Sequence, residues 1–280
     1  MLRLIDTHTH FDVPEFDHDR VQQAIHACAQ GVEAVVLIGY LAAYFPRLLA
    51  TQQQLSALEL GRRMPSVLLA PGLHPFYIQQ HQLGDIALVE DFLRENACVA
   101  IGEIGLDTYT PEMKIPAVFQ AQQTLFADQL ALAREHQLPV LLHIRRAHAD
   151  TLAELKRQKF PHGGIAHAFS GGIEEAKAFI KRGFKLGVTG QITDPNAKRL
   201  RHVVTTVGPE HLVLETDCPD MTPLCCRIAG ESHTRNTPAN LPQVLDGLAA
   251  LLEMDKARLA SQLWHNSLAA LALGDLPSMV

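Results

Sequence analysis

The chain has 280 residues, of which 47% are hydrophobic and 19% are charged, and its formal net charge at pH 7 is −6. This is an ordinary globular composition. It excludes a protein that coats nucleic acid along its length, because such a protein would be basic. Any contact with nucleic acid should therefore be local and confined to a cleft.

The five cysteines are odd in number and include no Cys-x-x-Cys pair. This pattern favours a reducing compartment and argues against a disulfide framework or a zinc finger. We recognise no signal peptide before the first apolar run, and no run approaches the roughly 18 residues that a membrane span needs. We therefore expect a cytoplasmic protein with no membrane contact and no obligate protein partner.

Apolar runs and helical spacings alternate along the chain. Strands are expected at residues 4–10, 33–38, 66–73, 98–103, 139–143, 164–167, 184–189 and 211–216. Helices are expected at residues 17–30, 44–63, 85–96, 117–137, 149–158, 173–182 and 196–207, with closing helices over 238–273. Residues 219–238 contain three prolines and should form a long loop.

Eight strands, each followed by a helical segment, predict an α/β fold in which residues 1–280 form a single domain, a (β/α)8 TIM barrel. Several strands are continuous apolar runs, as expected for a parallel sheet that is buried on both faces. An open doubly wound sheet is the alternative, but the sequence contains no phosphate-binding glycine fingerprint. In a TIM barrel the active site lies at the C-terminal ends of the strands.

Nearly every expected strand ends in a side chain that can bind a metal ion. These residues are His8, His10, His74, Glu103, His143, His167 and Asp217. Each alone could be a solvated or hydrogen-bonded residue, but burying so many polar groups together without a metal would be costly. The mixture of imidazoles and carboxylates suits Zn²⁺, Mn²⁺ or Mg²⁺. Six or seven ligands exceed one four-coordinate site, so two divalent ions are expected.

Several segments, in order along nearly the whole chain, resemble the motif series of the TatD family of metal-dependent hydrolases and deoxyribonucleases. They are Ile-Asp-Thr-His-Thr-His (5–10), Gly-Leu-His-Pro (72–75), Gly-Glu-Ile-Gly-Leu-Asp (102–107), Leu-His-Ile-Arg (142–145), His-Ala-Phe-Ser-Gly (167–171), Leu-Glu-Thr-Asp (214–217) and Arg-Asn-Thr-Pro-Ala-Asn-Leu-Pro (235–242). Residues 214–221 resemble the YjjV-type branch in particular. The family belongs to the amidohydrolase-like metal barrels.

The resemblance implies a role for each metal-competent residue. His8, His10 and Asp217 would hold one metal ion, His143 and His167 would hold the second, and Glu103 would bridge the two ions. Bound metal lowers the pKa of a water molecule that attacks phosphorus. Asp217 would orient this water or take its proton, so Asp217 and Glu103 are the expected catalytic residues. The family implies phosphodiester hydrolysis, often exonucleolytic on DNA.

Further residues are expected around the metal ligands. Asp6, Asp107 and Glu215 are candidates for an outer shell that fixes the orientation of the ligands, although Asp6 and Glu215 could each instead be the acidic partner in a buried ion pair that holds the barrel floor together. The candidates for contact with the substrate phosphate are His74, Arg145 and Arg235.

The leading hypothesis is therefore a phosphodiesterase or deoxyribonuclease that uses two metal ions. Its substrate would be a phosphoester, with single-stranded or short DNA favoured over long duplex DNA by the negative net charge. A metal-dependent amidohydrolase or deacylase that acts on a C–N or C–O bond is the alternative, since it needs the same ligands. A non-catalytic metal-binding barrel is disfavoured, because the ligand set is complete.

Overall fold

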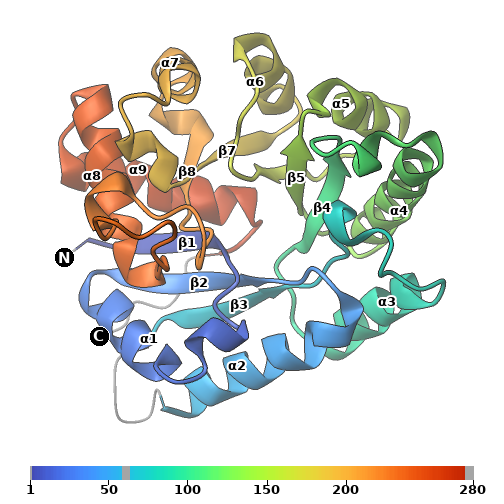
Figure 1. Ribbon diagram of the computed structural model, residues 1–280, viewed down its shortest axis with the longest axis horizontal. Coiled ribbons are helices and arrows are strands. Elements are labelled where there is room, and N and C mark those ends of the chain that lie inside the picture. The colour runs from blue at the N-terminus through green and yellow to red at the C-terminus, as the bar shows by residue number, and fades with distance from the viewer. Residues whose placement is uncertain (1, 59–63, 275–280) are drawn as a thin grey trace.

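The computed structural model describes residues 2–58 and 64–274, in which strands and helices alternate around a central barrel (Figure 1). The strands are β1 (Leu4–Thr9), β2 (Val32–Ile38), β3 (Ser66–Ala70), β4 (Ile101–Asp107), β5 (Val140–Arg145), β6 (Gly164–Ala166), β7 (Phe184–Val188) and β8 (Leu212–Leu214). The helices are α1 (Arg20–Ala29), α2 (Phe45–Leu58), α3 (Asp85–Glu95), α4 (Pro116–Glu135), α5 (His148–Arg157), α6 (Ile173–Ile180), α7 (Lys198–Val207), α8 (Leu241–Leu252) and α9 (Lys256–Ala270). The last part of the helix expected at 44–63, residues 59–63, lies outside the described residues.

The strands pair in parallel and in chain order, β1 to β3 in one ladder and β4 to β8 in a second. Individual backbone hydrogen bonds cross the two seams between the ladders. Val99 N–H donates to Leu69 O over 2.9 Å, and Asp217 N–H donates to His8 O over 2.9 Å. The predicted (β/α)8 barrel is confirmed, and the single domain over 1–280 stays a prediction.

The fourth strand differs most from its expected bounds, because it spans residues 101–107 and not 98–103. Glu103 therefore lies inside the strand. The strand continues because Gly105 lies beside His143 of β5, at a φ of +143° and with no room for a side chain. A Cβ atom on Gly105 would lie 2.1 Å from His143 O. The first helix also begins later than expected, at Arg20, because residues 14–16 form a 3₁₀ turn that starts with Pro14.

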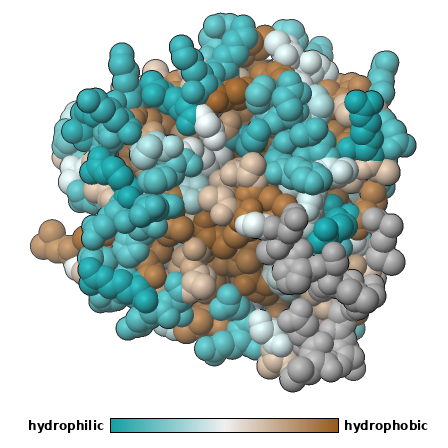
Figure 2. Space-filling model, turned by 180° about the vertical axis from the view of Figure 1, so that it is seen from behind, coloured by the Kyte–Doolittle hydropathy of each residue, from teal (hydrophilic) through white to brown (hydrophobic). Residues whose placement is uncertain are grey.

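Apolar residues fill the barrel away from the strand C-termini. One buried cluster joins Val36, Ala100, Leu141 and Val213 to Leu271, at the end of α9. Seen from behind, a hydrophobic area lies in the middle of the surface, with hydrophilic side chains above it and to its left (Figure 2). Within residues 2–58 and 64–274, none of the helices combines the length and the hydrophobicity of a membrane span.

Candidate metal centre

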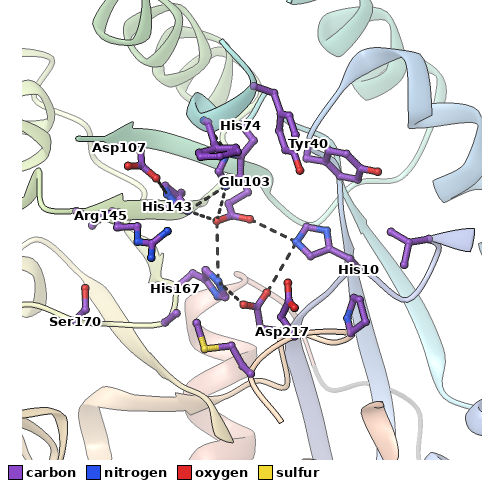
Figure 3. Close-up of a pocket in the computed structure, with 18 of the residues that line it drawn as sticks. His10, Tyr40, His74, Glu103, Asp107, His143, Arg145, His167, Ser170 and Asp217 are labelled. Carbon is purple, nitrogen blue, oxygen red and sulfur yellow. Dashed lines mark hydrogen bonds and ion pairs between the residues drawn. The ribbon is translucent and has the colours of Figure 1, made fainter. Parts of the chain in front are cut away.

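The metal-competent residues predicted from six strands converge at one end of the barrel (Figure 3). His8 lies in β1 and His10 directly follows it, on the same side because side chains alternate along a strand. Glu103 lies in β4 and His143 in β5, while His167 and Asp217 follow the ends of β6 and β8. His8 and Glu103 are only 1% and 2% exposed, so their polar atoms depend on one another or on a bound ion.

Glu103 is at the centre of this cluster, and its two carboxylate oxygens face different histidines. Oε2 lies 3.1 Å from His8 Nε2 and 3.6 Å from His10 Nε2. Oε1 lies 2.7 Å from His143 Nδ1 and 4.0 Å from His167 Nε2. Burial alone would raise the pKa of Glu103, but the surrounding imidazoles outweigh it and hold the pKa well below its ordinary value. The side chain is therefore an ionised carboxylate that spans two groups of imidazoles.

Asp217 closes the other side of the cluster. Its Oδ1 lies 3.8 Å from His8 Nε2 and 3.9 Å from His10 Nε2, and its Oδ2 lies 3.5 Å from His167 Nε2. Its backbone has a left-handed φ of +55°, which aspartate tolerates better than most residues do. Burial acts to raise the pKa of Asp217, but His167, His8 and His10 together outweigh this effect and lower it. Asp217 is thus a second ionised carboxylate in the site.

Three sets of donor atoms lie close enough to hold a metal ion, with the atoms of each set within 4.8 Å of one another. The sets are His8–His10–Asp217, His8–Glu103–His167 and His74–Glu103–His143. Imidazole nitrogens and carboxylate oxygens are donors that suit divalent ions, so the residues fit a metal centre. The first set is the one expected for the first ion. The structure groups His143 with His74 and groups His167 with His8, whereas the resemblance placed His143 and His167 on one ion.

Comparison of the whole sequence with known protein families identifies the family of this chain. The family described as "TatD related DNase" matches residues 5–272. The chain belongs to the TatD family. The resemblance predicted from the motifs is therefore confirmed.

Individual relatives of this TatD-family protein match it over nearly their whole length. The "Uncharacterized metal-dependent hydrolase YjjV" of Escherichia coli K12 is 34% identical over 267 residues, which cover 95% of this chain and 96% of the relative. The "3'-5' ssDNA/RNA exonuclease TatD" of Escherichia fergusonii is 32% identical over 250 residues, which cover 88% and 90%. The crystal structure of E. coli YjjV matches with a TM-score of 0.84 at 33% identity, covering 98% and 99% of the two chains.

His74 lies among the candidate metal ligands, and its contacts make its ring a hydrogen-bond donor toward the site. Its Nδ1 accepts the backbone N–H of Phe76 over 2.9 Å. Burial lowers the pKa of His74 to about 4, so the ring is neutral and carries its single proton on Nε2. Nε2 lies 3.2 Å from Glu103 Oε1 and 3.1 Å from His143 Nδ1. In this arrangement His74 points an N–H group toward Glu103 and His143.

Asp107 holds His143 from behind. Its Oδ2 accepts a hydrogen bond from His143 Nε2 over 2.8 Å, which leaves Nδ1 to face Glu103. Burial acts to lower the pKa of His143, but the two carboxylates outweigh this effect and raise the pKa to about 9. The backbone N–H of Tyr109 donates to Asp107 Oδ1 over 2.7 Å and fixes the carboxylate in turn.

Glu215 lies behind His167. Its Oε1 is 2.9 Å from His167 Nδ1 and accepts the backbone N–H of Ala168 over 2.6 Å. Room for this carboxylate comes from Gly187, because a Cβ atom there would lie 2.3 Å from Glu215 Oε1. Glu215, which follows β8, thus lies against a candidate ligand that follows β6, with β7 between the two strands, although the sequence placed it only next to Asp217.

Asp6 contacts the segment just before Asp217. Among the described residues, it contacts none of the imidazole rings of the cluster. Its two oxygens accept the N–H of Thr216 over 2.8 Å and the hydroxyl of Thr216 over 2.5 Å. This contact fixes the segment before Asp217 against β1. The expectation that Asp6 and Glu215 form an outer shell stays a prediction for their effect on metal binding.

The two arginines expected to contact phosphate have different surroundings. Arg145 lines the cavity above the cluster, and its guanidinium lies 3.5 Å from the ring centroid of Tyr109. Among the described residues, no carboxylate lies within ion-pair distance of it. Arg235 instead forms an ion pair with Asp19, at 3.0 Å from Nη1 to Oδ1, and lies over the ring of Phe16. Arg235 does not line this cavity, so the structure does not bring it to the metal ligands.

The cavity above the cluster has a volume of about 920 Å³ and contains residues that the strand-end pattern missed. Aromatic side chains after β2 and β3 line one side of it, and Ser170, Gln191 and Met221 lie on other parts of the wall. The sequence carried one usable signal, because Tyr40 and Tyr77 follow the ends of β2 and β3 within a few residues.

We expect Asp107→Asn to weaken metal binding or turnover by about 10- to 100-fold, the usual effect of removing the carboxylate that orients a ligating histidine. Asparagine keeps the shape of the side chain but loses the charge that holds His143 Nε2. Metal titration of the purified variant measures the effect. Asp246→Asn is the control, because Asp246 is exposed on α8 and pairs only with Lys256. Equal metal affinity in the two variants would contradict this role of Asp107.

Proposed function

We propose that this TatD-family protein is a phosphodiesterase that uses two divalent ions and acts on single-stranded or short DNA. The observation that carries the proposal is the position of Glu103, whose two oxygens face separate groups of histidines. A carboxylate in this position can bridge two ions. A pair of ions about 3.5–4 Å apart suits in-line displacement at phosphorus. Zn²⁺, Mn²⁺ and Mg²⁺ all fit the donor set.

Divalent ions held by these residues would polarise the phosphate and lower the pKa of a water molecule. Asp217 is ionised and lies partly buried beside His8, His10 and His167, where it can orient the attacking water and accept its proton. His74 Nε2–H donates to a phosphate oxygen. These two residues supply the base and one hydrogen-bond donor of the proposed reaction.

Arg145 supports a phosphate-containing substrate over an amide. Its planar guanidinium lies in the wall of the cavity, held against Tyr109, and can bind a phosphate through two parallel hydrogen bonds. The net charge of −6 opposes the binding of long duplex DNA. Among the described residues that line the cavity, Arg145 is the one lysine or arginine. The exonuclease named TatD among the relatives acts on single-stranded DNA and RNA according to its name, which supports a substrate of this class.

A screen of metals against substrates tests the proposal. The protein stripped with a chelator should be inactive, and Mg²⁺, Mn²⁺ or Zn²⁺ should restore hydrolysis of bis-p-nitrophenyl phosphate and of a single-stranded oligonucleotide. Elemental analysis should give up to two ions per chain. Full activity after the metal has been removed would contradict the proposal. A metal-loaded enzyme that is inert on phosphoesters but cleaves an amide or an ester would establish the amidohydrolase or deacylase alternative.

A further inference from the structure

Four aromatic residues form a wall beside the cavity, and three of them line it. They are Tyr40 and Tyr44, after β2, and Phe76 and Tyr77, after β3, and we call this set the aromatic wall. Tyr40 lies 5.4 Å from both Tyr44 and Tyr77, measured between ring centroids, and Phe76 lies 5.6 Å from Tyr77. Three of the chain's four tyrosines gather here, so the wall is a local concentration of aromatic surface.

The aromatic wall directly adjoins the metal-ligand cluster. The ring of Tyr40 lies 5.6 Å from that of His10, and the ring of Tyr77 lies 5.6 Å from that of His74. Arg145 lies on the opposite side of the cluster from Tyr40 (Figure 3). A phosphodiester at the metal centre would therefore have an aromatic surface on one side and a guanidinium on the other.

The wall is open to the cavity and is not part of the packed core. Tyr44 and Phe76 each leave 42% of their surface exposed, and Tyr40, Phe76 and Tyr77 line the cavity. Among the described residues, no hydrogen bond engages the hydroxyl of Tyr40 or Tyr77. Burial raises the pKa of Tyr40 to about 12 and also raises that of Tyr77, so both phenols stay neutral. Their rings present uncharged π faces to a ligand.

We propose that the aromatic wall is a stacking subsite for a nucleobase next to the scissile phosphate, an inference that rests on the proposed phosphodiesterase function. Aromatic side chains bind the faces of single-stranded bases with little sequence preference, because every base has a π face. A base within a duplex is already stacked and paired, so this subsite selects single strands. The subsite would also make the enzyme favour nucleic acid over phosphoesters that carry no base, a preference that the metal centre alone does not provide.

The test compares two strands that share a phosphodiester backbone. One is a short oligothymidylate, and the other is a strand of equal length built from abasic tetrahydrofuran residues. The metal-loaded wild-type enzyme should cleave the base-containing strand with a kcat/KM about tenfold higher, the effect of one stacked base. Tyr77→Leu should lower cleavage of the base-containing strand about tenfold more than cleavage of the abasic strand, so that the preference is lost, and Tyr77→Phe should keep the preference because the ring remains.

Tyr109→Leu serves as the matched control, because Tyr109 supports Arg145 and is not part of the aromatic wall. It should slow cleavage of both strands by the same factor. Equal cleavage of the two strands by the wild-type enzyme, or an equal loss on both strands in Tyr77→Leu, would overturn the stacking subsite alone. Failure of the metal-loaded wild-type enzyme to cleave either strand would contradict both the proposed function and the stacking subsite.

Discussion

Replacing Glu103 with glutamine is expected to lower phosphodiester turnover by about a thousandfold and to reduce the bound metal, because the loss of metal-assisted stabilisation costs several kcal/mol. Glutamine keeps the size of the side chain but has one oxygen in place of two, so it cannot face both groups of histidines with an acceptor. Its amide would also leave His8 or His143 beside an N–H group in a buried site. Steady-state kinetics with bis-p-nitrophenyl phosphate and elemental analysis measure the two effects.

Glu112→Gln is the matched control for this variant, because Glu112 is exposed just beyond the end of β4. We expect it to retain wild-type activity and metal content. Circular dichroism should show that both variants are folded. If Glu103→Gln retained wild-type metal content and turnover, Glu103 would not be the bridging ligand.

Asp217→Asn should reduce turnover by about 10²- to 10⁴-fold, the range that a positioned general base contributes. The asparagine amide cannot accept a proton from the attacking water, whereas the ionised carboxylate can. Its effect on metal content should be smaller than that of Glu103→Gln, because Glu103 and the histidines remain. Single-turnover kinetics at saturating metal concentration separate the chemical step from metal binding.

Asp246→Asn is again the control, because it changes an exposed aspartate on α8 that is remote from the cavity. Its turnover should match that of the wild-type protein. A kcat for Asp217→Asn within a factor of two of the wild-type value at saturating metal would rule out Asp217 as the base. A large loss that excess metal fully restores would make Asp217 a ligand only.

The predicted ligands came together because their positions depend on features that are local in sequence. Strand order and the hydrophobic pattern place every strand end at the same face of a barrel. His8, Glu103 and Asp217 each follow from this rule, although they are far apart in the chain. The hydrophobic pattern did not predict where the fourth strand ends. The strand continues past Glu103 to Asp107 because Gly105 allows a close approach to His143.

The contacts around the ligands depended on tertiary neighbours that sequence position does not reveal. Arg235 was expected to bind phosphate, but Asp19, 216 residues away in sequence, engages its guanidinium. Glu215 follows β8 and yet lies behind His167, which follows β6. Such pairings depend on rotamers and on packing between elements, and neither is encoded in the spacing of residues along one strand.

By itself, the sequence determined the barrel, its active face and the metal-competent residues at that face, because hydrophobic periodicity and strand order act through local rules. Only the tertiary structure decided how these residues divide their roles. It placed the N–H of Phe76 against His74 Nδ1, directed Asp107 to His143, and brought Tyr40 and Tyr77 to one wall of the cavity. Each of these outcomes is set by distances of a few ångströms between separate loops, and only the folded chain fixes such distances.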